Sequence, residues 1–284
     1  MRLGLIANLT KPDAVGAAAS AADFLRERGA EVVLHPDLAE ALRVKTTAPL
    51  KDSDLVLCFG GDGTILHAVR ETGPSGPPTL GVNLGSLGFL TAVSSNEVTS
   101  CLEAVLAKEY VVEDRSLVRA RFTDTKGDSQ TLEALNEIVV DEGTFTRRAV
   151  ELDVRVSGSY LGTFTGDGLI VATPTGSTAY SLSAGGPIVK ASLTAFTITP
   201  IAAHSLSIRP LVIDDTEVIE VENHLAGVRL KVTADGHGAQ EIAANTVIRI
   251  ERSPHQTQLA FLKNVSYYDI LRDKLNWGGL PNKR

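Results

Sequence analysis

A glycine-rich segment with a single carboxylate is the first feature of the chain that could do chemistry. The apolar residues 55–59 lead into Gly60-Gly61-Asp62-Gly63-Thr64, and a helix-like stretch follows. A strand, a tight turn and a helix in this order place free backbone N–H groups and a helix N-terminus together, which suits a phosphate. Glycines would allow positive φ angles and close approach of a ligand. The segment has neither P-loop spacing nor the G-x-G-x-x-G fingerprint, so it predicts a phosphate-binding turn of another type.

Asp62 is the unexpected residue of this turn, because a carboxylate repels phosphate unless it has a task. It could accept a proton from a hydroxyl nucleophile, or it could help to hold a divalent metal on a polyphosphate. A structural alternative is that Asp62 only caps the following helix. The pattern leaves these three possibilities open.

A second glycine-rich segment spans residues 81–91 and again follows a predicted strand. We expect it beside the first turn at the same sheet edge, where open α/β sheets bind ligands. The alternative is an ordinary loop with turn glycines.

Polar residues also interrupt apolar runs in the second half of the chain. Asn136-Glu137 lies in a strand-like run, where adjacent side chains point to opposite faces, so at least one should meet a buried or ligand-filled space. A solvated edge position for Glu137 is the alternative. Residues 173–186 are dense in hydroxyls and small side chains, and Tyr180 could supply an aromatic face for a base. A Ser/Thr-rich surface loop is disfavoured there, because Tyr180 and Leu182 are embedded among small residues.

Two kinds of element must position these residues. Alternating strand and helix patterns over residues 1–114 predict an α/β domain with a parallel sheet, with Ser95 capping one helix. The expected strands are 3–7, 31–34, 55–59 and 79–82, and the expected helices are 12–28, 64–71 and 95–108.

Residues 115–262 change to a period of two, as in residues 150–156, with a hairpin turn at Gly158-Ser159. This predicts a β-rich, sandwich-like second domain, and we expect the tail 263–284 to return to the first domain. Further expected strands are 169–172, 197–201, 217–221, 228–232, 247–250 and 259–262.

Composition excludes several classes of function. The 27 basic and 34 acidic residues give a net charge of −7, which disfavours non-specific electrostatic binding to nucleic acid. Two distant cysteines and no signal-peptide or membrane-spanning pattern favour a cytoplasmic protein. None of the six histidines has metal-ligand spacing, so we assign no metal ligand and expect His67 to be a packing residue. No G-x-S-x-G elbow supports a hydrolase.

Taken in order, the polar segments resemble the NAD kinase family in its bacterial form. The most specific match is residues 173–186. The other matching segments are 60–64, 83–91, 136–137 and 167–168, with weaker agreement at 204–210, 235–236 and 274–278.

This resemblance implies transfer of a phosphoryl group from ATP, with Mg²⁺ or another divalent metal, to the 2′-hydroxyl of the adenosine ribose of NAD. Asp62 would be the proton acceptor at the floor of a cleft between the domains. The implied dinucleotide-binding residues are Asp62, Gly63, Phe89, Asn136, Glu137, Arg147, Thr165, Asp167, Thr178, Ala179, Tyr180, Ser183 and His237.

Within this set the resemblance implies particular roles. Asn136 and Glu137 would meet the adenine and ribose hydroxyls, Asp167 would hold the second nucleotide part, and Phe89 would close the side near Asp62. Arg147 would supply positive charge. His237 stands where the family often has Gln, and a neutral imidazole could replace only one of the hydrogen bonds of that amide.

The resemblance also implies a homodimer or homotetramer, and polyphosphate could replace ATP as donor. No nucleic-acid or membrane partner is expected. Two other functions remain open at this point: a lipid or sugar kinase that shares the elbow, or a nucleotide-sensing module without catalysis. Asp62 argues against a pure sensor, which needs no carboxylate beside phosphate.

Overall fold

The chain forms two compact units in the computed structural model. One comprises Met1–Asp114 with Thr257–Arg284, and the other comprises Arg115–Gln256. The structure describes residues 1–45, 48–85, 88–142, 149–205, 207–223, 229–243, 246–263 and 266–277.

The first unit is built on a parallel sheet. Its strands pair in the order β2-β1-β3-β4-β5, and the end of the long strand β17 adds to β4 through Leu259 and Thr79. These strands are continuous runs of apolar residues, because helices cover both faces of a parallel sheet and bury the side chains on each face. Their bounds are β1 Arg2–Ala7, β2 Glu31–Leu34, β3 Leu55–Gly60, β4 Thr79–Asn83, β5 Thr91–Val93 and β17 Ile248–Leu262.

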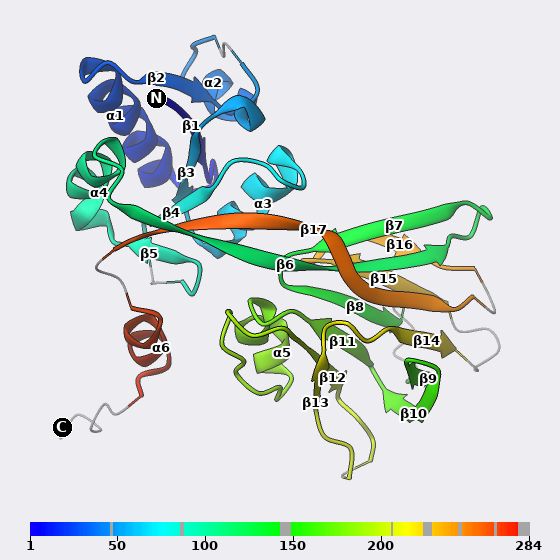
Figure 1. Ribbon diagram of the computed structural model, residues 1–284. Coiled ribbons are helices and arrows are strands. Elements are labelled where there is room, and N and C mark those ends of the chain that lie inside the picture. Colours follow the sequence, from blue (N-terminus) through cyan, green and yellow to red (C-terminus); the bar gives the residue numbers. More distant parts are fainter. Residues whose placement is uncertain are drawn as a thin grey trace. The chain divides into compact units, whose positions relative to one another are not determined.

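Helices cover both faces of this sheet. Figure 1 shows α1 and α4 on one side of the parallel strands and α3 on the other. The first side forms a core in which Leu5, Leu25, Phe59 and Leu102 are buried. The helices are α1 Pro12–Glu27, α2 Pro36–Ala41, α3 Asp62–Thr72, α4 Val98–Leu106 and α6 Tyr267–Leu275, with short 3-10 turns η1 Leu50–Asp52 and η2 Ser95–Glu97. Among the described residues, none of the helices is long and apolar enough to cross a membrane.

The expected cap at Ser95 is wrong by one residue. Ser94 caps the η2–α4 segment, because its N–H and hydroxyl both reach the Glu97 carboxylate, at 3.1 and 2.6 Å. Serine followed three residues later by glutamate is a capping box, and only Ser94 has that spacing.

The second unit is a β-sandwich, which confirms the β-rich prediction. One sheet has the order β13-β12-β11-β8-β15-β16, and the other contains β10-β9-β14-β17 together with β6 and β7. Residues of both sheets share one core around Phe196, Leu152 and Val140. The bounds are β6 Tyr110–Thr123, β7 Ser129–Ala134, β8 Glu137–Glu142, β9 Val150–Val156, β10 Ser159–Gly166, β11 Gly168–Ala172, β12 Ala195–Ile201, β13 Leu211–Asp214, β14 Ile219–Asn223, β15 Leu230–Ala234 and β16 His237–Glu241, with η3 Gly176–Thr178 and α5 Tyr180–Ser183.

Two expectations in this unit need correction. The hairpin turn is Ser157-Gly158, with φ of 49° and 81°, because a two-residue turn of this type needs positive φ at both central positions. The expected strands 247–250 and 259–262 belong to one strand, β17. Buried polar residues such as Ser253 and Thr257 lie within it. They interrupt the apolar pattern, so the sequence indicated two short strands instead of one long strand.

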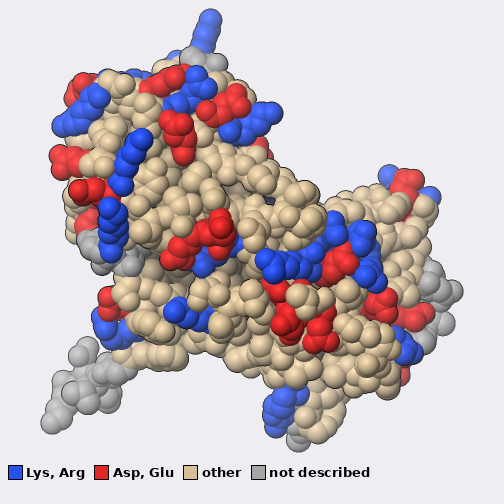
Figure 2. Space-filling view, viewed as in Figure 1, with Lys and Arg blue, Asp and Glu red and all other residues tan. Residues whose placement is uncertain are grey.

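Charge is dispersed over the surface in view. On the face shown in Figure 2, basic and acidic side chains are interspersed rather than gathered by sign.

Candidate active site

The glycine-rich elbow joins β3 to α3 as predicted. β3 ends at Gly60, Gly61 is the N-cap residue, and α3 begins at Asp62. A Cβ at Gly60 would lie 2.2 Å from Thr64 Oγ1, and Gly61 has a φ of −116°. None of the three elbow glycines has a positive φ, so the expectation of positive φ is wrong, and close packing against Thr64 explains Gly60 instead.

Asp62 turns its carboxylate away from its own helix and toward the second glycine-rich segment. Oδ2 accepts the Phe89 N–H at 2.9 Å, and Oδ1 accepts the Leu90 N–H at 3.1 Å and the Thr91 hydroxyl at 3.5 Å. Because α3 has no side-chain cap, the simple capping alternative is wrong. The expectation that the two glycine-rich segments lie side by side is confirmed.

Gly88 makes this contact possible, and sequence reasoning did not single it out. A Cβ at Gly88 would lie 1.9 Å from Asp62 Oδ1, and the Gly88 N–H donates to Thr91 Oγ1 at 3.1 Å. Any side chain there would displace the carboxylate. The glycine spacing of residues 81–91 was the available signal.

The Asp62 carboxylate retains some capacity to accept another hydrogen. An ionised carboxylate offers about four lone-pair positions, and the segment 88–91 occupies three of them. Asp62 is half-buried, and its neighbour Gly63 is exposed. This geometry leaves room for one hydroxyl proton or one metal contact, but not for a full metal cage.

A cation also lies at this edge of the sheet. The Lys11 ammonium would be 3.5 Å from a Cβ at Gly85, so the end of the β1–α1 loop approaches the second glycine-rich segment. Lys11 precedes α1, whereas Gly85 follows β4. The positive charge expected from Arg147 lies outside the described residues, and Lys11 is a cation that no sequence motif indicated.

In the second unit, Glu137 is a buried carboxylate on a central strand. β8 lies between β11 and β15, and Glu137 is 6% exposed, so the solvated-edge alternative is wrong. Burial, and then the nearby Asp235 carboxylate, raise its pKa to about 7, while a hydrogen bond from the Tyr180 backbone lowers it. Its Oε2 has no hydrogen-bond partner among the described residues, which makes it an acceptor available to a ligand.

Asp235 holds the Asn136-Glu137 segment in place. Its carboxylate accepts the N–H groups of Leu135 and Asn136, at 2.9 and 2.7 Å, and that of Glu137 at 3.2 Å. Asp235 lies at the β15–β16 turn with a φ of 50°, and Gly236 follows with 71°. The Asp-Gly dipeptide was noted in sequence, but its role as a clamp was not.

His237 follows this turn and is exposed. Its Nδ1 lies 2.8 Å from the Asp235 carbonyl oxygen. Because a carbonyl can only accept, Nδ1 carries a proton, and in the neutral imidazole Nε2 is then an acceptor. The imidazole therefore offers a ligand one acceptor, where a glutamine amide would offer both a donor and an acceptor.

Residues 173–186 are not a surface loop. They form η3 and α5, and several hydroxyls are satisfied inside the protein: Thr173 donates to the Leu135 carbonyl at 2.6 Å, and Ser177 to the Val189 carbonyl at 3.1 Å. Ser181 pairs with Thr199 at 2.8 Å. The hydroxyls of these three residues are therefore bonded within the protein. They shape the site by fixing the backbone.

Tyr180 is the aromatic side chain that this segment presents. It is 44% exposed, and its pKa is raised by partial burial and by the carboxylates of Asp141, Asp167 and Glu137. Asp167 is exposed. The surroundings of Tyr180 are thus acidic, which suits a hydroxyl-rich or cationic group better than a phosphate.

The remaining expected residues of the second unit lie on β10, η3 and α5 or between the last two. Thr165 is the last residue but one of β10, and its carbonyl accepts the His204 N–H at 2.9 Å. Thr178 donates to the Thr175 carbonyl at 3.2 Å, Ala179 is half-buried, and Ser183 is exposed at the end of α5. The structure brings Asp62 and Phe89 together in the first unit, and Asn136, Glu137 and Tyr180 together in the second.

Family models cover most of the chain. The ATP-NAD kinase N-terminal domain matches residues 3–110, and the ATP-NAD kinase C-terminal domain matches residues 135–262.

Curated relatives match over nearly full length. An NAD kinase of Syntrophotalea carbinolica is 39% identical over 98% of this chain and 99% of its own length. An NAD kinase of Moorella thermoacetica is 38% identical over 98% of this chain and 90% of its own.

Solved structures show the same fold. Yeast NADH kinase in complex with NADH superposes with a TM-score of 0.88 at 25% identity, covering 100% of this chain and 89% of the yeast chain. An NAD kinase from Archaeoglobus fulgidus in complex with ATP gives 0.73 at 29% identity, covering 96% and 99% of the two chains.

Proposed function

The chain belongs to the NAD kinase family and phosphorylates NAD, and we propose that Asp62 is the general base that accepts the proton of the attacking hydroxyl. The observation that supports this role is the orientation of its carboxylate by the Phe89 and Leu90 N–H groups, with one acceptor position left. In phosphoryl transfer most of the rate comes from positioning and charge neutralisation, and the protein needs no covalent intermediate. A fixed base that accepts the proton of the attacking hydroxyl is consistent with such a reaction. The 2′-hydroxyl of the adenosine ribose is the proposed acceptor.

Neither alternative function gains support from the relatives. The family models describe kinases acting on NAD over both halves of the chain, not lipid or sugar kinases and not sensing modules. We therefore assign the reaction ATP + NAD giving ADP + NADP.

The second unit supplies the proposed contacts to the nucleoside parts of NAD. Glu137 Oε2 is a buried acceptor suited to a ribose hydroxyl, and Tyr180 exposes a ring for a base. The acidic surroundings of Tyr180 would repel phosphates, so the pyrophosphate is not expected there. Asn136, Thr165, Asp167, Thr178, Ala179, Ser183 and His237 are proposed to complete this set, together with Arg147.

The first unit supplies the proposed contacts to phosphates. The start of α3 offers N–H groups, and Lys11 offers a positive charge beside Gly85. Mg²⁺ would enter with ATP and be held mainly by its phosphates, because the elbow contains one carboxylate, which is largely occupied by the segment 88–91. The ion would neutralise phosphate charge.

Replacing Asp62 by Asn tests the base. A general base contributes roughly 10²–10⁴-fold, so we expect kcat of Asp62→Asn to fall by at least that order while the KM for NAD changes little. Asn has only one acceptor oxygen, so one of the Phe89 and Leu90 N–H groups loses its partner, at a cost of about 1–3 kcal/mol in stability. Thermal unfolding measures that loss separately.

Thr91→Val is the matched control, because it removes a hydroxyl from the same cluster and leaves the carboxylate in place. We expect it to keep most of its turnover. Near-normal turnover in Asp62→Asn, or an equal loss in Thr91→Val, would reject Asp62 as the base.

The donor and acceptor are tested by measuring NADP with an NADP-specific dehydrogenase. Wild-type protein with Mg²⁺ and NAD is given ATP or polyphosphate, and a parallel series replaces NAD by NADH. Formation of NADP from ATP and NAD is the expected result, and its absence with every donor would overturn the proposal. A homodimer or homotetramer and a cytoplasmic location stay predictions from the sequence.

A further inference from the structure

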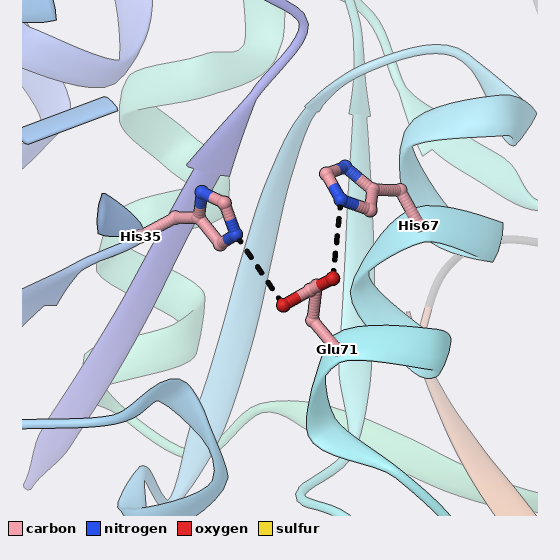
Figure 3. A group of neighbouring side chains, drawn as sticks. All are labelled: His35, His67 and Glu71. Carbon is pink, nitrogen blue, oxygen red and sulfur yellow. Dashed lines mark ion pairs between the residues drawn. The ribbon is translucent and has the colours of Figure 1, made fainter. Parts of the chain in front are cut away.

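Three potential metal ligands from two separate segments meet in the first unit. Figure 3 shows the His35 and His67 rings on either side of the Glu71 carboxylate. His67 and Glu71 are one turn apart on α3, and His35 is the N-cap residue of α2. The two carboxylate oxygens lie 3.7 Å from His35 Nε2 and 3.5 Å from His67 Nε2.

These side chains could hold a tetrahedral ion if their ligand atoms moved together by up to about 1.5 Å. Zinc bonds to His nitrogen and carboxylate oxygen at about 2.0–2.2 Å, which places neighbouring ligand atoms about 3.3 Å apart. The three ligand atoms here all lie within 4.8 Å of one another. We propose that His35, His67 and Glu71 bind one divalent transition-metal ion of the zinc class, which ties α3 to the start of α2.

The surroundings fit this role. Side-chain exposures of 8% for His35, 35% for His67 and 45% for Glu71 describe a site closed on one side and open on the other. The open side gives the ion a way in and leaves a fourth position for water.

Asp37 is placed to orient His35. The Asp37 N–H donates to His35 Nδ1 at 3.3 Å, and the Asp37 carboxylate lies 3.8 Å from the same nitrogen. Binding of the metal through Nε2 would place the ring proton on Nδ1, so the Asp37 N–H would give up its bond to that nitrogen and the Asp37 carboxylate would move closer to accept the Nδ1–H. A carboxylate behind a metal-bound histidine is a common arrangement and raises the basicity of the ligand.

The donor set separates this site from the magnesium that accompanies ATP. Two imidazoles and one carboxylate suit zinc, cobalt or nickel, whereas Mg²⁺ prefers oxygen ligands and keeps several waters. We therefore expect excess Mg²⁺ not to displace the ion. The proposed ion would stabilise the fold and take no part in the kinase reaction. Its test therefore does not depend on enzyme activity.

Binding is tested on the full chain after removal of metals with a chelator. Titration with Co²⁺ should produce the intense visible absorption of four-coordinate cobalt, at one ion per chain, and Zn²⁺ should abolish it by competition. Calorimetry with Zn²⁺ in the presence of excess Mg²⁺ should give the same stoichiometry. Zn²⁺ should also raise the thermal unfolding temperature, because a ligand that binds only the folded state stabilises it.

His67→Gln and Glu71→Gln are the informative variants, since both residues are partly exposed on α3 and the helix tolerates glutamine. We expect each to lose at least about 100-fold in Zn²⁺ affinity and to lose the cobalt spectrum, and Asp37→Asn to lose roughly 10–100-fold. His255→Gln is the control, because His255 contacts Glu133 at 3.1 Å as an ordinary His–Glu pair.

Wild-type cobalt absorption and zinc affinity in His67→Gln would overturn the proposal. So would their loss in His255→Gln, which would place the ion elsewhere. Absence of any bound Co²⁺ or Zn²⁺ in the wild type would show that the three side chains form only ion pairs.

Discussion

Glu137 lies at the start of β8 with 6% of its surface exposed, and the Asp235 carboxylate lies close to it. Burial and that neighbour raise its pKa from 4.5 to about 7. Between these two pH values the folded chain keeps a proton that the unfolded chain has released. The stability of the free protein should therefore fall as pH rises through this window and level off above about pH 7.

Replacing Glu137 by Gln should remove this dependence. The full effect corresponds to about 3 kcal/mol, so we expect Glu137→Gln to be more stable than the wild type at pH 8 and to lose less stability between pH 5 and pH 8. Urea unfolding at the two pH values measures it, with Glu103→Gln on the exposed side of α4 as control. An unchanged pH dependence in Glu137→Gln would contradict the assignment. The same variant should bind NAD more weakly, because the proposed ribose acceptor is weakened.

Lys11 is the second residue with a specific expectation. Its ammonium lies beside Gly85, at the same edge of the sheet as the start of the glycine elbow at Gly60. A hydrogen bond to a charged group contributes about 1.5–3 kcal/mol, so Lys11→Ala should raise the KM for ATP at least about 10-fold with a smaller change for NAD. Steady-state kinetics against each substrate measure this, and Lys11→Arg, which keeps the charge, should be less affected. An equal effect on both substrates would exclude a specific phosphate contact.

At the scale of elements, Gly176 sets how closely η3 approaches the residues before β8. A Cβ there would lie 2.0 Å from the Asn136 carbonyl oxygen and 2.6 Å from its Cα. Both atoms belong to the backbone, so they cannot rotate away. Two further bonds cross the same junction, from Thr173 N–H to the Asn136 carbonyl at 2.8 Å and from the Thr173 hydroxyl to the Leu135 carbonyl at 2.6 Å.

Gly176→Ala should therefore push the two segments apart. Overpacking typically costs about 1–3 kcal/mol, and displacement of Asn136 should also raise the KM for NAD. Gly16→Ala is the contrasting substitution, because Gly16 lies in α1 with no atom within 4 Å of the added Cβ. It should stabilise the chain by up to about 1 kcal/mol and leave kinetics unchanged. Similar thermal unfolding of Gly176→Ala and wild type would show that the junction yields.

At the scale of the molecule, each unit has its own hydrophobic core. The core of the second unit runs from Val118 to Ile250 and includes Phe196, while that of the first unit combines residues 3–105 with Ala260. The chain leaves the first unit along β6 and returns to it along β17. The first unit thus needs both ends of the chain, whereas the second is one continuous segment.

A fragment spanning residues 115–256 should therefore fold alone. We expect a cooperative thermal transition, since the described residues of its core all lie within 115–256, and no kinase activity, since Asp62 is missing. Circular dichroism and NADP formation measure the two properties. A fragment of residues 1–114 should be less stable, because it lacks the β17 residues that pair with β4. Non-cooperative melting of the 115–256 fragment would show that the unit depends on the rest of the chain.

The local sequence pattern was enough to predict several secondary-structure elements of this protein. The strands Glu31–Leu34 and Val150–Val156 agree with their predicted bounds, and the glycine elbow joins a strand to a helix as expected. These features depend on residues close together in sequence, where periodicity and turn chemistry act directly. The ordered motifs were also enough to point to the NAD kinase family.

Only the tertiary structure decided which groups those residues meet. Asp62 binds N–H groups 27 and 28 residues away, and the clamp from Asp235 reaches Leu135 across 100 residues. His35 joins His67 and Glu71 although its own neighbours in sequence give no metal signal. The hydroxyls of Thr173 and Ser177 face inward, which their composition did not show. Such contacts depend on how distant segments pack, and no local period encodes that.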